Sequence, residues 1–143
     1  MGIPVAPRSL TVAAKPASLR LVTEFVRRGA LEARLPESRI GELELLLDEL
    51  ITNVCAYAYQ DRADGDVTVS YSVPEPGELS VEVADQGAEF NPLDAAPPDV
   101  TLSLEARQIG GLGIYLVKAF TSFLTYRREQ GWNRLTFGIS AVS

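Results

Sequence analysis

The chain has 143 residues, of which 46% are hydrophobic and 22% are charged. This length fits one domain whose core buries roughly two-thirds of the unfolded surface, and the composition is that of an ordinary globular protein rather than a disordered one. The net charge of −6 argues against general nucleic-acid binding, which needs a basic surface. Proteins and small molecules remain as the expected partners.

The sequence contains no signal for a membrane or for secretion. No apolar run approaches the roughly 20 residues of a membrane span. The N-terminal segment 1–7 lacks a basic region followed by a long apolar stretch. We therefore expect a cytoplasmic protein with no membrane partner.

The numbers of cysteine and histidine residues exclude several kinds of catalytic and metal site. The single cysteine, Cys55, has no partner in the chain for a disulfide, and in a helix it is expected to behave as a small hydrophobic residue. The chain has no histidine, which excludes a Ser–His triad, a histidine metal site and a phosphohistidine.

The N-terminal part of the chain predicts a strand and then a helix. Residues 8–13 read as a short strand. Apolar residues then recur at helical spacing up to about Arg34, and the helix is predicted to begin near Pro16 or Ser18.

A second helix is predicted to open at Pro36 and to end near Tyr59. Glu49 and Asn53 lie four residues apart, so they share one face of this helix. Asparagine is a mediocre residue for a helix interior, which indicates a role other than helix formation. The alternative is a solvated polar flank. The pair borders an apolar stripe of Ile40, Leu43, Leu47, Leu50 and Val54.

A hairpin is predicted next, with strands over 66–73 and 79–83 joined by a turn at 74–77. Apolar and polar residues alternate along both strands. Continuing the second strand by one more period places Asp85 on its buried face. A buried carboxylate needs a hydrogen-bonding partner from backbone, water or ligand. The alternative is an aspartate that turns outward at the strand end.

Residues 87–109 contain three prolines and little periodicity, so they form a connection of about 20 residues, a length typical of functional lids or disordered segments. This connection leads into the glycine-bearing segment 110–113 and a helix through Phe120. A helix that opens on glycines offers free N–H groups and a positive dipole end to an anion. The alternative is a tight turn.

The chain ends in a second predicted hairpin, with strands over 123–128 and 132–139 and a turn at 129–131. Leu135, Phe137 and Ile139 share one face of its second strand.

Three of these segments together resemble the N, G1 and G2 boxes of the Bergerat-fold ATPases. They are Glu49-Leu-Ile-Thr-Asn53, Asp85-Gln-Gly87 and Gly110-Gly-Leu-Gly113, in this order along the chain. Within that superfamily the chain is most similar to the anti-sigma-factor serine kinases, particularly over 85–92 and 110–117. The resemblance extends over nearly the whole sequence.

The resemblance implies an α+β fold, a two-layer sandwich of the histidine-kinase-like ATPase type. Helices would cover one face of a mixed, mainly antiparallel sheet, with ATP held between the layers under a lid. We expect one domain over residues 8–141, preceded by an N-terminal tail at 1–7.

The resemblance also implies the roles of individual residues. Glu49 would act as the general base, and Asn53 would hold Mg²⁺ through its amide oxygen. Asp85 would accept a hydrogen bond from the adenine amine, and Gly87 would let the backbone approach the ring. The phosphates would be wrapped by Gly111, Leu112 and Gly113.

Three positions depart from the family pattern or have no assigned role. Tyr57 stands where the family commonly has a histidine. Asn133 is the inward-facing candidate in the last strand, where Bergerat ATPases often place a threonine beside the adenine. Arg107 lies just before the glycines, where it either reaches a phosphate or remains a solvated lid residue.

The function implied is a serine/threonine protein kinase that acts as an anti-sigma factor. It would phosphorylate a STAS-type anti-sigma-factor antagonist, sequester a sigma factor and form a homodimer. The alternative is a binding module that holds Mg·ATP and partner proteins without significant phosphotransfer. A sensor histidine kinase would need a phospho-accepting histidine, which the chain lacks.

Overall fold

The computed structural model describes residues 5–59, 64–91 and 119–142. These ranges contain five strands and two α-helices, with a 3-10 turn before the first helix and a π turn after the second. Neither α-helix is long and apolar enough to cross a bilayer. In chain order the elements are β1 (Val5–Ala13), η1 (Pro16–Ser18), α1 (Leu19–Glu32), α2 (Glu37–Asn53), η2 (Val54–Ala58), β2 (Asp66–Glu75), β3 (Glu78–Asp85), β4 (Phe123–Glu129) and β5 (Trp132–Ser140).

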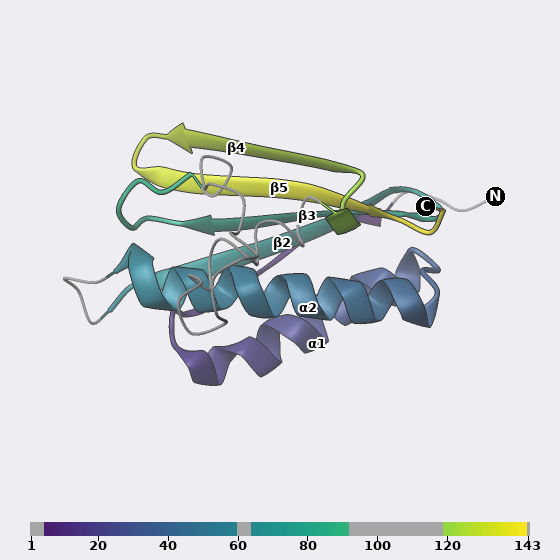
Figure 1. The fold of residues 1–143 in the computed structure, drawn as a ribbon, viewed down its shortest axis with the longest axis horizontal. Helices are drawn as coiled ribbons and strands as arrows, with labels where there is room; N and C mark the ends of the chain where they lie inside the picture. The colour runs from purple at the N-terminus through teal and green to yellow at the C-terminus, as the bar shows by residue number, and fades with distance from the viewer. Residues whose placement is uncertain (1–4, 60–63, 92–118, 143) are drawn as a thin grey trace, which may run out of the picture.

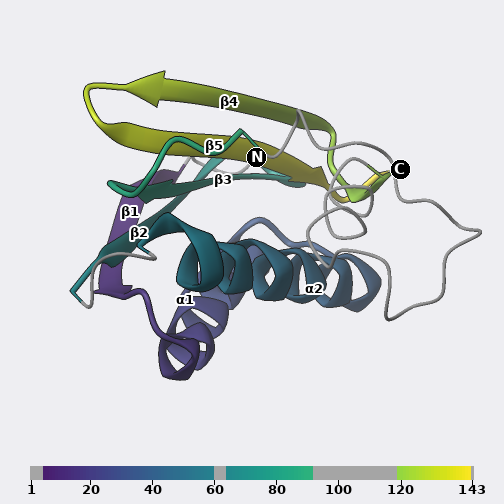
Figure 2. The ribbon, with the colours of Figure 1, turned by 60° about the vertical axis from the view of Figure 1, so that its left-hand side comes forward.

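The described elements form two layers. Helices α1 and α2 lie side by side against one face of the sheet, and the strands form the second layer (Figures 1 and 2). Each predicted helix and strand in these ranges is present, and β1 begins three residues before the predicted start, at Val5 rather than Arg8. The predicted α+β sandwich is therefore confirmed.

The sheet has the strand order β1-β2-β3-β5-β4. All four pairings among the described strands are antiparallel, so this part of the sheet is purely antiparallel rather than mixed. Strand β5 follows β4 in the chain but lies beside β3, in a register that pairs Asp85 with Asn133. The last residue of β3 therefore faces the second residue of β5.

The strand pattern matches the position of the helices. Along β2 every second residue is buried, as period-two alternation requires when one face of a sheet is covered. Strands β3 and β5 bury the corresponding residues on the same side, which packs against the apolar faces of α1 and α2. The largest fully buried side chains are those of Tyr71, Phe137, Ile40, Leu43, Leu46, Leu47, Ile51, Leu79 and Ile139.

A glycine allows α1 to approach the sheet closely. Gly29 lies over the ring of Tyr71, and a Cβ atom at position 29 would come within 2.6 Å of that ring. The Tyr71 ring is 1% exposed and also packs against Phe25, with 4.9 Å between the ring centroids. The ring thus has little room to move away from the helix.

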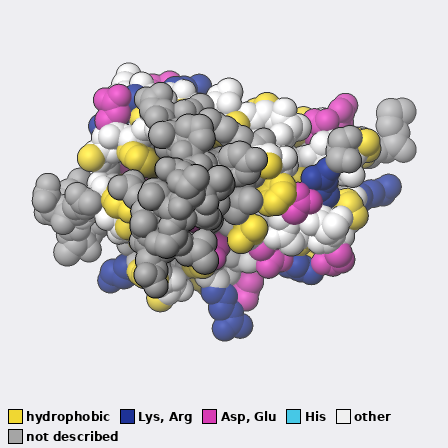
Figure 3. All heavy atoms as spheres, viewed as in Figure 1, with side chains coloured by type: hydrophobic (Ala, Val, Ile, Leu, Met, Phe, Trp, Pro, Cys, Tyr) yellow, Lys and Arg dark blue, Asp and Glu magenta, His cyan; other side chains and the backbone are white. Residues whose placement is uncertain are grey.

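The two helices are also linked by ion pairs on their exposed side. Arg27 of α1 lies 2.7 Å from Glu44 and 3.2 Å from Glu37. Basic and acidic side chains are interspersed along the described part of the helical layer in Figure 3. Exposed pairs contribute about 0–1 kcal/mol each, so apolar packing supplies most of the helix–helix stability.

Helix α2 changes its winding near its end. The α-helix ends at Asn53 and continues as the π turn η2 to Ala58, close to the predicted end near Tyr59. π turns are rare and occur frequently at functional sites. This turn carries Val54 and Ala58 toward the strand ends, where the candidate site lies.

Gly29→Ala is expected to lower the free energy of unfolding despite the better helix propensity of alanine. Overpacking a core typically costs about 1–3 kcal/mol, whereas the propensity gain is at most about 1 kcal/mol. The matched control is Gly41→Ala in α2, where a Cβ would meet nothing within 4 Å. Urea denaturation should show a loss for the first variant and a gain for the second. A gain in both would contradict the close packing of Gly29 on Tyr71.

Candidate functional site

Asp85 ends β3 and faces the interior. It is 6% exposed and follows the buried positions Val81 and Val83, as the strand period predicted. Its Oδ1 accepts hydrogen bonds from the backbone N–H of Gly87 at 2.9 Å and from the amide of Asn133 at 2.9 Å. The alternative of an outward-turning aspartate is thus wrong, and the buried carboxylate has the partners that its burial requires.

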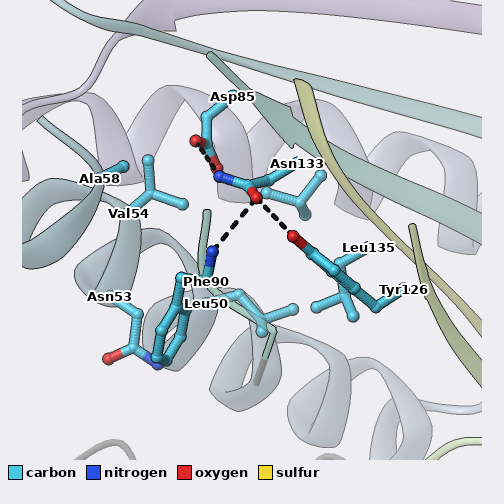
Figure 4. Close-up of a pocket in the computed structure, with 10 residues that line it drawn as sticks. Leu50, Asn53, Val54, Ala58, Asp85, Phe90, Tyr126, Asn133 and Leu135 are labelled. Carbon is cyan, nitrogen blue, oxygen red and sulfur yellow. Dashed lines mark hydrogen bonds between the residues drawn. The ribbon is translucent and has the colours of Figure 1, made fainter. Parts of the chain in front are cut away.

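Asn133 stands opposite Asp85 in β5 and links several elements. Its Nδ2 donates to Asp85 and, at 2.8 Å, to the carbonyl of Ala88. Its Oδ1 accepts from the Tyr126 hydroxyl at 2.6 Å and from Arg128 at 3.2 Å. Figure 4 shows Asn133 between Asp85 and Tyr126, with a hydrogen bond to each.

The turn after β3 is held by backbone contacts. A Cβ at Gly87 would lie 2.2 Å from the carbonyl oxygen of Ala58, so only glycine fits there without displacing the backbone. The next residue, Ala88, donates its N–H to that same oxygen at 2.9 Å. Arg128 donates to the Gly87 carbonyl at 2.8 Å. The end of η2 and this turn are therefore joined directly.

A pocket lies between α2, η2 and the ends of β3, β4 and β5 (Figure 4). The pocket has a volume of about 40 Å³. Among the described lining residues, Phe90 alone lies outside helices and strands, and it is 42% exposed. The lining residues are Leu50, Asn53, Val54, Ala58, Val83, Asp85, Phe90, Tyr126, Asn133 and Leu135.

The helical pair lies beside this pocket. Asn53 lines it and is 6% exposed, whereas Glu49 is half-buried one turn earlier in α2. The amide nitrogen of Asn53 donates to Glu49 Oε1 at 3.4 Å. With the nitrogen directed at the carboxylate, the amide oxygen of Asn53 is left as an acceptor.

The environment of Glu49 favours its protonated form. Burial raises the pKa of the Glu49 carboxyl above its ordinary value, and the charge of neighbouring Asp48 raises it further. The hydrogen bond from Asn53 opposes both effects but does not cancel them. A carboxylate of raised pKa is a stronger base, which is the property that proton abstraction near neutral pH requires.

The donors present fit a magnesium ion shared with phosphates. In the described part of the chain, no three acidic, histidine or cysteine side chains are grouped to hold a metal by themselves. Mg²⁺ usually takes only one or two protein oxygens and completes its shell with water and substrate phosphates. The amide oxygen of Asn53 is one such ligand.

Several predicted residues lie outside the described ranges. They are Arg107, Gly111, Leu112 and Gly113, the lid residue and the phosphate-binding segment. Of the helix predicted to follow the glycines, only its last two residues, Ala119 and Phe120, are described, and both are helical. Cys55 is half-buried in η2, and burial raises the pKa of its thiol, which disfavours the reactive thiolate.

The structure adds residues that the sequence did not single out. Tyr126 and Arg128 from β4 join the Asp85–Asn133 pair. Both lie in the predicted strand, and the period of β4 places them on one face, but their contact with Asn133 depends on the β4–β5 pairing. Tyr57 is 45% exposed, and its ring lies 6.2 Å from that of Phe90 at the pocket rim.

The sequence matches the family described as Histidine kinase-like ATPase domain over residues 12–139. Because this match covers most of the chain, the chain belongs to the histidine kinase-like ATPase family.

Curated relatives narrow this assignment. The chain is 33% identical over 94 residues to the serine/threonine-protein kinase BtrW of Bordetella bronchiseptica, a match that covers 66% of each chain. It is 30% identical over 119 residues to the serine-protein kinase RsbW of Listeria monocytogenes, covering 76% of this chain and 75% of the relative. The predicted resemblance to the anti-sigma-factor serine kinases of this superfamily is thereby confirmed.

Solved structures agree on the fold. The structure of the RsbU and RsbW domains of Rv1364c from Mycobacterium tuberculosis matches with a TM-score of 0.66 at 17% identity, over 94% of this chain and 32% of that chain. A blue-light activated histidine kinase of Erythrobacter litoralis matches with a TM-score of 0.56 at 25% identity, over 75% of this chain and 32% of the other. The chain thus corresponds to about a third of each longer protein.

Glu49→Gln is expected to stabilise the fold near neutral pH and to leave it unchanged in acid. A carboxyl whose pKa is raised on folding contributes stability below its unfolded pKa and loses it as the pH rises through the folded pKa. Glutamine stays neutral, so it avoids this loss. Urea denaturation of both proteins at about pH 7.5 and about pH 4 measures the difference.

The control for that experiment is Glu75→Gln, which removes the same charge from an exposed position at the end of β2. This control separates the effect of burying the carboxylate on stability from the effect of reducing the net charge. An equal gain in both variants would show that burial of Glu49 has no separate effect.

Proposed function

We propose that the chain is an ATP-dependent serine/threonine protein kinase acting as an anti-sigma factor. The observation that carries the proposal is the position of Asp85, a buried carboxylate at the end of a pocket whose other wall carries Asn53, one helical turn from Glu49. Asp85 offers a contact for the adenine base, Asn53 one for a metal ion, and Glu49 one for the reacting hydroxyl. The names of the curated relatives support the same reaction.

In the proposed complex the adenine ring occupies the pocket. Its walls are largely apolar, which suits a flat ring, and Asp85 supplies one directional acceptor for the exocyclic amine. The backbone turn at Gly87 lies at the edge of this ring. The phosphates extend toward Gly111, Leu112 and Gly113, whose backbone N–H groups would bind them.

The proposed reaction uses two polar residues of α2, Glu49 and Asn53. Asn53 would hold Mg²⁺ through Oδ1, and the ion would supply positive charge to neutralise the phosphates. Glu49 accepts the proton of the attacking serine or threonine hydroxyl on one carboxylate oxygen. Burial raises the pKa of this carboxyl, so the carboxylate accepts a proton more readily than that of an exposed glutamate.

The proposed protein substrate is a STAS-type anti-sigma-factor antagonist, and a sigma factor and a second copy of the chain are the other proposed partners. The family membership supports these partners. The residues for nucleotide binding and for transfer overlap except at Glu49. A protein that binds Mg·ATP and its partners without significant transfer is therefore the alternative that the experiments below distinguish.

Asp85→Asn is expected to weaken ATP binding at least about tenfold. The variant replaces a charged acceptor, whose hydrogen bonds are worth about 1.5–3 kcal/mol, with an amide of the same shape. Calorimetric titration of ATP into both proteins, with and without Mg²⁺, measures the loss. Equal affinities would refute the role of Asp85. No binding to the wild-type protein would refute nucleotide binding by the isolated chain.

Glu49→Gln is expected to lower phosphotransfer to a STAS-domain partner by about 10²–10⁴-fold, the usual contribution of a general base. Affinity for Mg·ATP should stay close to that of the wild type, because glutamine keeps the size of the side chain. Labelled ATP and the purified partner give the rate in a single-turnover assay. Transfer at the wild-type rate would exclude Glu49 as the base. No transfer by the wild type despite tight binding would favour the binding module.

A further inference from the structure

The amide of Asn133 is fully used within the protein. It takes part in five hydrogen bonds, two donated by Nδ2 and three accepted by Oδ1 from Tyr126, Arg128 and the backbone of Phe90. An amide offers two N–H donors and one oxygen acceptor with two lone pairs, so little capacity remains for a ligand. Although Asn133 lines the pocket, a base would have to displace an existing partner to bind it.

The orientation of this amide is also fixed. Both partners of Nδ2 are acceptors, the Asp85 carboxylate and the Ala88 carbonyl, and all three partners of Oδ1 are donors. Turning the amide by 180° would place acceptors against acceptors and donors against donors. The side chain therefore presents its donor, and not its acceptor, to Asp85.

That donor constrains the carboxylate that faces the pocket. Among the described residues, both donors to Asp85 bond Oδ1, one from the local turn at Gly87 and one from across the sheet at Asn133. Two donors from different directions hold Oδ1 in place. Oδ2 is then left to accept a hydrogen bond from a ligand in the pocket.

We infer that Asn133 is a positioning residue that sets the preference for adenine over guanine by holding Asp85 in one orientation. The inference rests on the proposed nucleotide function. Adenine presents an amine donor at C6, whereas guanine presents a carbonyl oxygen there. A fixed carboxylate accepts a hydrogen bond from the adenine amine and repels the guanine carbonyl oxygen. Without its donor at position 133, Asp85 turns away more easily, so ATP loses its contact and GTP loses its repulsion.

The test compares Asn133→Thr with Asn133→Val. The two side chains have nearly the same shape, and only threonine retains a hydroxyl that can donate to Asp85 across the strand pair. Both variants lose the contacts with Ala88 and Tyr126 equally. Calorimetric titrations of Mg·ATP and Mg·GTP give the ratio of the affinity for ATP to the affinity for GTP. We expect this ratio to be at least about tenfold lower in the valine variant than in the threonine variant, the effect of one hydrogen bond to a charged group.

If Asn133 has a purely structural role, both variants should lose nucleotide affinity to the same extent. Equal ratios of ATP to GTP affinity in the two variants would overturn the inference. The matched control is Thr136→Val, which removes a hydroxyl from the opposite face of β5 and should leave the ratio unchanged. If the valine variant does not fold, Asn133→Ser and Asn133→Ala provide the same comparison.

Nucleotide binding by the wild-type protein distinguishes failure of this inference from failure of the proposed function. Wild-type binding of ATP and GTP with equal affinity would overturn the inference alone. A wild type that binds neither nucleotide would overturn the proposed function, and the inference with it.

Discussion

The candidate site depends on the burial of one carboxylate, that of Asp85. A charge this far from water is tolerated only when it is hydrogen-bonded, and the required donors come from two directions. The local turn supplies Gly87, and the neighbouring strand supplies Asn133. The β3–β5 pairing, the glycine in the turn and the β4 residues that orient the asparagine all serve this requirement. The same carboxylate is the directional group that the pocket offers to a ligand.

The site is divided between the two layers of the fold. The sheet supplies the groups proposed to recognise the base, and α2 supplies Glu49 and Asn53. Their separation is set by the apolar packing of the helix on the strands, so a change in the core alters the site without touching it. The π turn adds a direct link, because the Ala58 carbonyl accepts the N–H of Ala88. A shift of α2 along its axis would therefore also move the turn beside Asp85.

Much of this arrangement could be predicted from the sequence, because period-two and period-3.6 patterns determine which face of each element is buried. The inward direction of Asp85 followed from the phase of a single strand. The partner of Asp85 did not, because Asn133 lies 48 residues away and only the β3–β5 register brings the two together. The π turn has no periodic signature, and the contact of Gly29 with Tyr71 depends on how closely a helix approaches the sheet. Residues whose role depends on pairing between distant elements were the ones that pattern analysis missed.

The contact between Gly87 and Ala58 affects how natural variation at this motif is read. Glycine is needed here because a backbone oxygen lies 2.2 Å from where a Cβ would be, whether or not a nucleotide is ever bound. A descendant without the proposed kinase activity would still need glycine at this position in order to fold. Preservation of Gly87 among related sequences therefore reports on architecture, whereas replacement of Glu49 would mark the loss of the proposed general base.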